Sequence, residues 1–537
     1  MQEVAQPIER THRPTTTRIL VTEPLAESGL ALLREEAEVD TRYKIPHEEL
    51  VRIIPEYDAL IVRSGTKVTR DVIEAGERLR VIGRAGTGVD NIDLRAATER
   101  GIIVVNAPTA NCIAAAEHAI ALMFAVARNI PQAHQAMQRG EWDRHRFVGT
   151  AVVDKVMGIV GFGRVGGEVA RRARGLGMRV LAYDPYLPRE RAQALGVELV
   201  SLEELLATAD FVSLHVPLVE STRNLINAER LALMKPTAYL INVARGGVVD
   251  EDALVQALDE GRLAGAALDV FSEEPPRDTR LATHPKIVTT PHLGASTTEA
   301  QIGVATEVAR AVLMSLRGEL APTTVNAPML APETLRELRP FVDLAERLAR
   351  LAVQLVAHGP SEVRIIYRGA FNEDTRLLRA AVIKGLLEPI GEYHVNFVNA
   401  DLLAQQRGLR VVEERHTATD GLSETIEVRL TNGDYHSVQG AVLRGSPRVI
   451  RIGDFWIDLE LQGCMLLCRN QDRPGMIGKV GAILGEADVN ISFMQVGRDQ
   501  PRGQAVMAIG LDEEPPADVL DQIRAIEGIE DVRLVEI

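Results

Sequence analysis

Cysteine is scarce in this sequence, whose 537 residues include three, Cys112, Cys464 and Cys468. So few thiols in so long a chain exclude a disulfide framework and favour a reducing compartment, and we therefore expect the cytoplasm. Cys464 and Cys468 lie four positions apart, but no second pair of cysteines or histidines lies nearby to complete a zinc site. We expect no metal.

Basic charge and long apolar runs are also lacking. Lysine and arginine number 60 against 75 aspartate and glutamate, which gives a formal net charge of -15. We expect no nucleic-acid partner, because a general one requires a basic face to neutralise phosphates. No stretch reaches the roughly 18 uninterrupted apolar residues of a membrane span, so we expect no membrane partner. Residues 1–17 are polar, lack the apolar core of a signal peptide and are interpreted as a disordered leader.

What the sequence does contain is a regular alternation of short β-branched runs and amphipathic stretches. The runs expected to form strands are 18–21, 59–62, 81–83 and 102–105 in a first set, and 158–160, 180–183, 211–214, 239–242 and 265–268 in a second. Strands that alternate with helices form βαβ units, so we predict α/β domains with parallel sheets. The apolar stretch Cys112–Ala127 is predicted as a buried helix that links two lobes or packs at a subunit interface.

The chain changes in texture after Asn326, where Pro322, Pro328 and Pro332 mark a linker. The elements predicted beyond it are a helix over 334–357, a strand over 363–367, strands within 409–461 with a hairpin turn at Asn432-Gly433, and a strand–helix–strand–strand–helix–strand order over 464–537. The second half is therefore expected to be of the α+β class.

A glycine-rich turn opens the second set of strands. In Gly161-Phe162-Gly163-Arg164-Val165-Gly166 a strand ends and a helix begins. The first glycine permits a tight turn, the second lets the backbone approach a pyrophosphate, and the third lets the helix pack closely on the strand. Asp184 ends the next strand, where a carboxylate accepts hydrogen bonds from the adenosine ribose and repels a 2′-phosphate. The pattern predicts NAD rather than NADP, the alternative being that Asp184 is only a turn residue before Pro185.

Three further motifs follow strands of the same set, at 242–247, 269–275 and 290–295. Open α/β sheets bind ligands at the carboxyl ends of their strands. The residue types suit hydride transfer on a 2-hydroxy or 2-keto acid, because a histidine carries a proton near neutral pH, an arginine holds a carboxylate and an acid orients the imidazole. Each motif alone also fits a surface histidine or a turn, but together they predict an active site.

In this order, after the glycine-rich turn, the motifs resemble the D-2-hydroxyacid dehydrogenase family over residues 18–326. The resemblance implies that Arg245, Glu274 and His292 are catalytic, with Glu274 rather than Glu273 because the matching acid precedes the proline. The implied NAD contacts are Thr87, Gly161, Gly163, Arg164, Val165, Gly166, Asp184, Val216, Val243, Ala244, Arg245, Asp269, His292, Gly294 and Ala295.

The resemblance also implies how the chain divides into domains. The expected domains are a flavodoxin-like substrate domain of residues 18–108 and 293–326, a Rossmann-type doubly wound NAD domain of residues 109–292, an α+β intervening domain of residues 327–462 and a ferredoxin-like βαββαβ domain of residues 463–537. The active site is then expected in the cleft between the first two domains.

Two loops after strands of the first set carry arginines, Arg63 and Arg84, that are candidates for an anion seat. The alternative is that both are ordinary solvated charges. The loops resemble those of the branch of the family that oxidises D-3-phosphoglycerate, the first step of L-serine biosynthesis. The implied substrate contacts are Arg63, Ser64, Arg84, Gly86, Asn111 and Arg245, together with Arg144 from a neighbouring subunit of a homo-oligomer, a dimer or tetramer.

The last segment resembles the amino-acid-binding ACT domain through the loop at 471–475 and the strand start at 487–491. The resemblance implies that Asn470, Asp472 and Asn490 hold an effector between two chains, and L-serine is our candidate. The alternative is a dimerisation module without a ligand. Two other functions stay open for the whole chain, a glyoxylate or hydroxypyruvate reductase and a non-catalytic NAD-sensing scaffold, and a turnover assay separates the scaffold from both enzymes.

Overall fold

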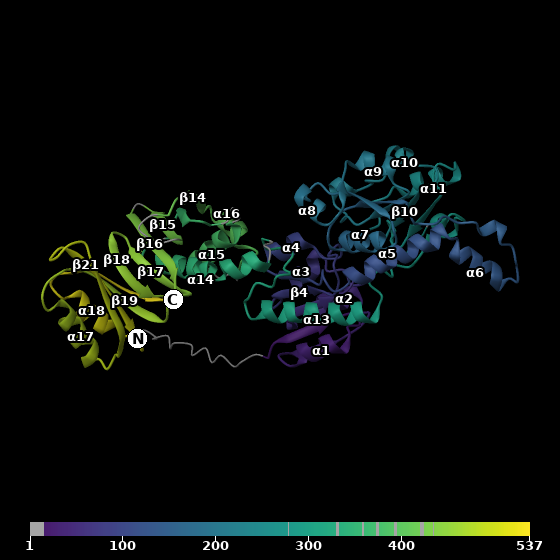
Figure 1. Cartoon of the computed structure of the whole chain (residues 1–537). Helices are drawn as coiled ribbons and strands as arrows, with labels where there is room; N and C mark the ends of the chain where they lie inside the picture. The colour runs from purple at the N-terminus through teal and green to yellow at the C-terminus, as the bar shows by residue number, and fades with distance from the viewer. Residues whose placement is uncertain are drawn as a thin grey trace.

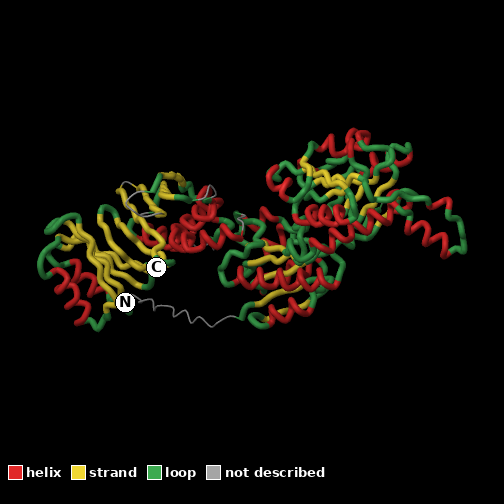
Figure 2. The backbone as a smooth tube through the Cα atoms, in the orientation of Figure 1, coloured by secondary structure: helices red, strands yellow, loops and turns green. Residues whose placement is uncertain are grey.

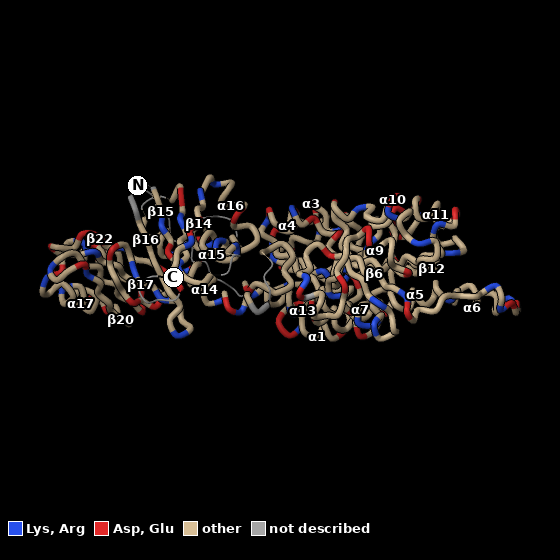
Figure 3. Tube along the Cα trace, turned by 45° about the horizontal axis from the view of Figure 1, so that its top comes forward, with Lys and Arg blue, Asp and Glu red and all other residues tan. Residues whose placement is uncertain are grey.

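The computed structural model describes residues 16–537 except 278, 329–331, 357–358, 372–374, 391–394, 419–423 and 433. Of the leader predicted over residues 1–17, only residues 16 and 17 are described. Gly433 of the predicted turn at Asn432-Gly433 also lies outside the described residues. Four sheets follow one another along the chain, and the second and fourth sheets lie toward opposite ends of the molecule (Figure 1). Acidic and basic residues are interspersed along the described chain (Figure 3).

The first sheet is parallel, with the strand order β2-β1-β3-β4-β5. Its strands are β1 (Arg18–Val21), β2 (Glu38–Thr41), β3 (Ala59–Val62), β4 (Val81–Arg84) and β5 (Ile103–Asn106). Its helices are α1 (Glu27–Arg34), α2 (His47–Ile53), α3 (Arg70–Ala75) and α4 (Leu94–Glu99). All four residues of β3 are buried, as expected for a parallel strand covered on both faces. The strand order is that of flavodoxin-like sheets.

The second sheet is also parallel, with the order β12-β11-β10-β9-β6-β7-β8. Its strands are β6 (Val156–Val160), β7 (Arg179–Tyr183), β8 (Glu198–Leu199), β9 (Phe211–Leu214), β10 (Tyr239–Asn242), β11 (Gly265–Leu268) and β12 (Ile287–Thr289). Its helices are α7 (Arg164–Gly175), α8 (Arg189–Ala194), α9 (Leu202–Thr208), α10 (Ala228–Leu233), α11 (Glu251–Asp259) and α12 (Arg280–Thr283). The order reverses between β6 and β9, which is the ligand-binding switch point of doubly wound sheets.

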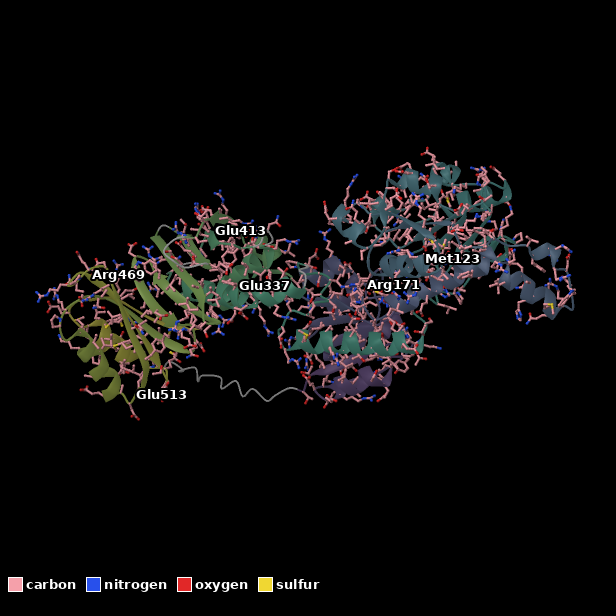
Figure 4. The ribbon with its side chains drawn as sticks, viewed as in Figure 1. Met123, Arg171, Glu337, Glu413, Arg469 and Glu513 are labelled. Atoms are coloured by element: carbon pink, nitrogen blue, oxygen red, sulfur yellow. The ribbon has the colours of Figure 1, made fainter. Side chains whose placement is uncertain are left out.

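Two long helices connect these sheets. Helix α5 (Cys112–Ala127) packs under the second sheet, with Ala116, Ala119 and Met123 in its core, which agrees with the predicted buried helix (Figure 4). Helix α13 (Thr298–Leu316) returns to the first sheet and packs on α1, β4 and β5. In the described chain no single helix is long and apolar enough to cross a membrane; α5 and α6 (Ile130–Gln138) pass that test only together, and they are bent by 62°.

The third and fourth sheets, whose strands lie together on the left of Figure 2, are built mainly from antiparallel pairs. The third has the order β14-β13-β15-β16-β17-β18, and the fourth has the order β20-β21-β19-β22. The strands are β13 (Glu362–Gly369), β14 (Arg410–His416), β15 (Glu424–Asn432), β16 (Asp434–Leu443), β17 (Ser446–Ile452), β18 (Phe455–Glu460), β19 (Cys464–Gln471), β20 (Ile491–Arg498), β21 (Gln504–Leu511) and β22 (Ile529–Glu536). The helices are α14 (Pro332–Gln354), α15 (Arg376–Leu387), α16 (Ala400–Gln406), α17 (Met476–Glu486) and α18 (Ala517–Arg524).

Helix α14 joins the last two sheets. One face of the fourth sheet packs on α17 and α18, and the other face shares a hydrophobic core with α14 and the third sheet. Met465 and Leu467 on that second face belong to the same core as Leu344 and Leu348 of α14. Gln354 at the end of α14 exchanges two hydrogen bonds with the backbone of Glu536, at 2.9 and 3.0 Å.

The predicted α/β architecture, with two parallel sheets followed by α+β and βαββαβ regions, is confirmed. The sheets fall within residues 18–106, 156–289, 362–460 and 464–536, and the domain limits given above stay a prediction. Strands β2 and β8 were not among the predicted strands, and β12 was expected only as the strand before the motif at 290–295.

Candidate active site

Three loops meet at the carboxyl edge of the second sheet. They follow β10, β11 and β12, which are neighbours in the sheet and carry the three motifs singled out from the sequence. The approach is close, because a Cβ on Gly246 would lie 1.7 Å from the carbonyl oxygen of Phe271. A Cβ on Gly294 would lie 3.0 Å from the Val243 side chain. The loops that carry Arg245, Glu274 and His292 are therefore packed against one another.

His292 and Glu274 form a hydrogen-bonded pair. The imidazole Nδ1 lies 2.7 Å from Glu274 Oε2, and the backbone N–H of Phe271 donates to Glu274 Oε1 at 3.2 Å. Burial pushes the pKa of the Glu274 carboxyl upward, but the hydrogen bond and charge of His292 outweigh burial, so the pKa lies below its ordinary value. Glu273 pairs instead with Arg277 on the surface. The structure thus pairs the expected glutamate, and not its neighbour, with the histidine.

Arg245 reaches from the second sheet toward the first. Its Nε lies 3.4 Å from Asp90 Oδ2, and a Cβ on Gly88 would lie 2.2 Å from its Nη2. Glycine at position 88 therefore allows the guanidinium to approach the backbone of the other domain. Its Nη1 donates to the carbonyl of Ala244 at 2.7 Å, which fixes the side chain near its own loop.

Arg84 adds a second cation near Arg245, where loops of the two parallel sheets meet; this place is called the cleft. Burial, together with the charge of Arg245, lowers the pKa of its guanidinium to about 10, while Glu23 and Asp90 act in the opposite direction. Its Nη1 donates to the carbonyl of Ala85 at 2.9 Å, and its Nε is buried with no hydrogen-bond partner. Positive charge is thus concentrated here, which suits an anionic ligand.

The Gly86 backbone has φ +150°, and a Cβ at this position would lie 2.0 Å from Arg84 Nη1. Any side chain would displace that guanidinium. Thr87 follows and donates from Oγ1 to Asn111 Oδ1 at 3.0 Å, so these two predicted contacts lie together where the chain passes between the two parallel sheets.

Arg63 lies on a loop whose backbone is held by Glu23. The Glu23 carboxylate accepts the N–H groups of Arg63, Gly65 and Thr66 at 2.8 to 3.0 Å. These three donors are thereby occupied within the chain, so an anion would meet the side chains of Arg63 and Ser64 rather than these N–H groups. Arg63 is partly exposed and makes a 3.4 Å contact with the carbonyl of Pro24. The sequence analysis did not find Glu23, because its partners lie about forty residues away.

The glycine-rich turn has the geometry of a dinucleotide site. Gly161 has φ +90°, and a Cβ there would lie 2.6 Å from the His215 carbonyl and 2.8 Å from Val216 Cγ1. A Cβ on Gly166 would lie 2.2 Å from the Gly161 carbonyl, so the helix packs closely on the strand as predicted. Nothing lies within 4 Å of a Cβ on Gly163, which leaves space for a ligand beside the helix N-terminus.

Asp184 lies at one wall of a cavity of about 990 Å³ beside this turn. The carboxylate accepts the N–H groups of Phe162 and Tyr186, both at 2.9 Å, which holds it at the end of β7. Gly163, Arg164 and Arg171 also line the cavity, and Arg171 lies on α7 (Figure 4). Space, phosphate-facing backbone and a fixed carboxylate fit the adenosine half of NAD.

Asp269, a predicted NAD contact, has a fully buried side chain. Its carboxylate accepts the N–H groups of Leu293 and Gly294 at 2.7 and 2.8 Å. Thr290 Oγ1 and His118 Nε2 also reach it. Of the other predicted contacts, Arg164 and Val165 are the first two residues of α7, Val243 and Ala244 lie in the Arg245 loop, and Ala295 follows the His292 turn. Asp269 thus supports that turn from below, a role that the sequence did not indicate.

Four predicted residues lie away from the cleft in a single chain. Arg144 is exposed and lies beyond α6, which projects from the NAD-binding end (Figure 1). Asn470 and Asp472 lie at one end of the fourth sheet, beside the start of β21, and Asn490 lies at the other end (Figure 4, near Arg469 and Glu513). One chain therefore does not bring the three effector candidates together.

Comparison with known proteins covers nearly the whole chain. Residues 120–294 match the D-isomer specific 2-hydroxyacid dehydrogenase NAD binding domain, 337–453 match the D-3-phosphoglycerate dehydrogenase intervening domain, and 465–528 match the ACT domain. The chain is 53% identical over 536 residues to D-3-phosphoglycerate dehydrogenase 2, chloroplastic, of Arabidopsis thaliana, covering 96% of this chain and 86% of that one. It is 45% identical to D-3-phosphoglycerate dehydrogenase of Methanocaldococcus jannaschii, covering 97% of this chain and 100% of that one.

Solved structures match the catalytic half. A glyoxylate reductase from Paecilomyes thermophila is 33% identical with a TM-score of 0.54, covering 58% of this chain and 99% of that one. The D-lactate dehydrogenase of Escherichia coli is 28% identical with a TM-score of 0.52, covering 57% of this chain and 100% of that one. The chain binds NAD and belongs to the D-3-phosphoglycerate dehydrogenases, a branch of the D-2-hydroxyacid dehydrogenase family.

Proposed function

We propose that this enzyme oxidises D-3-phosphoglycerate to 3-phosphohydroxypyruvate with NAD, the first step of the phosphorylated route of L-serine biosynthesis. The observation that supports this proposal best is the hydrogen-bonded pair of His292 and Glu274. The loops of this pair pack against the loop of Arg245, and Arg84 lies near Arg245. A base, an orienting acid and a cationic seat are the groups that oxidation of an anionic 2-hydroxy acid requires.

Side chains of the protein accept the proton that leaves the substrate hydroxyl. Gly161, Gly163 and Asp184 would hold NAD along the glycine-rich turn, where it would supply the acceptor for the hydride from C2 of the substrate. Glu274 accepts a hydrogen bond from Nδ1–H of His292, which leaves Nε2 free to take the proton of the 2-hydroxyl. The carboxylate then stabilises the imidazolium that forms. Arg245 holds the substrate carboxylate, and Arg84 and Arg63 provide charge for the phosphate.

The reductase alternative shares the catalytic set but does not require a phosphate seat or the C-terminal domains. The glyoxylate reductase structure covers only the catalytic half of this chain, whereas the intervening and ACT regions match separate models. Initial rates of NAD reduction with D-3-phosphoglycerate test the proposal directly. No turnover, together with efficient reduction of glyoxylate, would favour the reductase, and no turnover with either would favour the NAD-sensing scaffold.

NAD preference is tested at Asp184. Removing the carboxylate in Asp184→Ala removes an acceptor for the ribose hydroxyls and a charge that repels a 2′-phosphate, so the KM for NAD should rise and discrimination against NADP should weaken. The control is Asp454→Ala, at an aspartate whose side chain is 95% exposed in the turn between β17 and β18. A wild-type preference for NADP would contradict this interpretation of Asp184.

A second copy of the chain is the partner that we propose for the segment around α6. Trp142 is 76% exposed and Val148 79%, with Met137 at 54% and Ile130 at 52%. Apolar side chains this exposed on a projecting segment mark an interaction surface. Arg144 lies between Trp142 and Val148 and would enter the partner's cleft, as the family resemblance implies. Sedimentation of the wild type and of Trp142→Ser tests the assembly, and a monomeric wild type would exclude it.

L-Serine between two ACT domains is the regulatory ligand that we propose. Asn470 is 2% exposed, and its side-chain oxygen has no hydrogen-bond partner, so it can accept a donor such as an ammonium group. Asp472 lies close by, while Asn490 would come from the second chain.

We propose the cytoplasm as the compartment because of the low cysteine content. Two Arabidopsis relatives are named chloroplastic, and fractionation of the producing cells tests the proposed compartment.

A further inference from the structure

The turn that carries His292 has an unusual backbone. His292 has φ +56°, a left-handed conformation that costs energy for a residue with a Cβ. Its N–H donates to the carbonyls of Asp269 and Thr290 at 2.9 and 3.0 Å. Such a conformation persists only where its surroundings hold it. The groups that hold this turn therefore set the position of the imidazole.

Asp269 holds the turn from below. Its side chain is fully buried, and its two carboxylate oxygens take the N–H groups of Leu293 and Gly294, the two residues after His292. Burial raises the pKa of the Asp269 carboxyl, but hydrogen bonds from His118, Thr290 and Leu293 bring it below its ordinary value. An ionised carboxylate accepts hydrogen bonds only, so each neighbouring group acts as a donor toward it.

His118 is the side chain that reaches this carboxylate from helix α5. Its Nε2 lies 3.2 Å from Asp269 Oδ1 and 3.0 Å from Thr290 Oγ1, and Thr290 Oγ1 itself lies 2.5 Å from Asp269 Oδ1. The imidazole is 19% exposed. Because α5 packs on β10 and β11, the ring is anchored to the rigid part of the domain and not to the loop.

We propose that His118 is a positioning residue for the proposed reaction: its Nε2–H fixes the Asp269 carboxylate, which in turn holds the Leu293 and Gly294 amides and so keeps His292 aligned. It touches neither substrate nor cofactor and acts through Asp269. The proposal rests on the assignment of His292 as the base, but the state of the turn can be measured without turnover.

The test replaces His118 by two amide side chains of different length, glutamine and asparagine. In His118→Gln the amide nitrogen reaches about the position of Nε2 and keeps the donor to Asp269, whereas in His118→Asn it reaches only about that of Nδ1. We expect His118→Asn to lower kcat about 10-fold with KM for both substrates within about twofold, and His118→Gln to stay within about threefold of wild type. Ala121→Gln and Ala121→Asn, at an exposed position of the same helix, measure the difference in helix propensity.

Hydrogen exchange provides the readout that does not need activity. The amides of Leu293 and Gly294 should exchange faster in His118→Asn than in wild type and near the wild-type rate in His118→Gln. Equal kcat and equal exchange in the two variants would overturn the proposal, as would a loss confined to the KM for NAD, which would make Asp269 a direct cofactor contact. A wild type inactive on phosphoglycerate would sink the proposed function, and the exchange rates would still decide the role of His118.

Discussion

The catalytic cleft and the ACT end of the chain gather polar side chains in different ways. In the second sheet the strands are parallel, so the residues that follow β10, β11 and β12 meet at one edge. In the ACT sheet Asn470 lies near the end of β19 and Asn490 lies before the start of β20, which places them at opposite edges. The second sheet thus brings its three catalytic candidates together within one chain, whereas the fourth sheet keeps Asn470 and Asn490 apart.

The two regions also differ in how their charges are satisfied. Arg84 in the cleft keeps a buried Nε without a partner, and the nearby charge of Arg245 acts against its own. At the ACT end Asp472 already accepts Arg498 at 3.1 Å and the N–H of Arg502 at 2.9 Å. The cleft is therefore poised for an anion, while a ligand at Asp472 has to compete with internal partners.

The largest expected effect is at His292. His292→Ala removes the base, and we expect kcat to fall by about 10²–10⁴-fold while NADH binding changes little. His47→Ala is the matched control, because His47 pairs with Asp71 at 2.6 Å and is 47% exposed against 46% for His292, but lies outside the cleft. Steady-state rates and NADH fluorescence titration measure both quantities. A near-normal kcat in His292→Ala would remove this residue from the mechanism.

The next effect tests whether the cleft recognises phosphate. Arg63→Ala should cost roughly 1.5–3 kcal/mol of binding for the phosphorylated substrate, through the loss of a charge-assisted hydrogen bond. The comparison is between kcat/KM for 3-phosphohydroxypyruvate and for hydroxypyruvate, with Arg95→Ala, 86% exposed at the side chain, as control. Equal losses for the two substrates would show that Arg63 does not recognise phosphate.

A two-chain ACT site predicts a specific effect of serine. L-Serine should bind the ACT domain and inhibit turnover, with a coupling free energy of about 1–3 kcal/mol between the effector site and the active site. Asn490→Ala should weaken serine binding, since the amide would come from the second chain. Ser492→Ala, an exposed change two residues further on, is the control. Calorimetric titration checks this, and no binding at millimolar serine would leave the domain as an assembly module.

The smallest effect concerns acid stability. The pKa of Glu274 is depressed in the folded state, so its contribution to stability is present above its ordinary pKa of 4.5 and is lost as pH falls through the folded value. The side chains are 38% and 46% exposed, so the pair is worth about 0–1 kcal/mol. Thermal unfolding of wild type and Glu274→Gln from pH 7 to pH 3 should show a difference that shrinks with acid. A constant difference would mean that the pair with His292 does not stabilise the fold.

The sequence predicted those parts of the fold and site that depend on local patterns. Apolar strands such as β3 and β9 were found, whereas β2 is a polar edge strand and β8 has two residues, so neither carries a hydrophobic signal. Arg245, Glu274 and His292 could be proposed because each follows a strand in a motif, and the structure brings the loops that carry them together. Glu23, Asp90 and His118 were missed because their partners are set by tertiary packing across 40 to 155 positions of sequence.

Helix α14 determines which parts of this chain can fold independently, because it shares one core with the third and fourth sheets. The ACT sheet has two apolar faces, and one of them is covered by α14 and the third sheet rather than by helices of its own. A truncation after residue 462 would expose Leu344 and Leu348 on one piece and Met465 and Leu467 on the other. The intervening and ACT regions should therefore unfold as one cooperative unit, and a regulatory module exchanged between relatives has to carry its α14 with it.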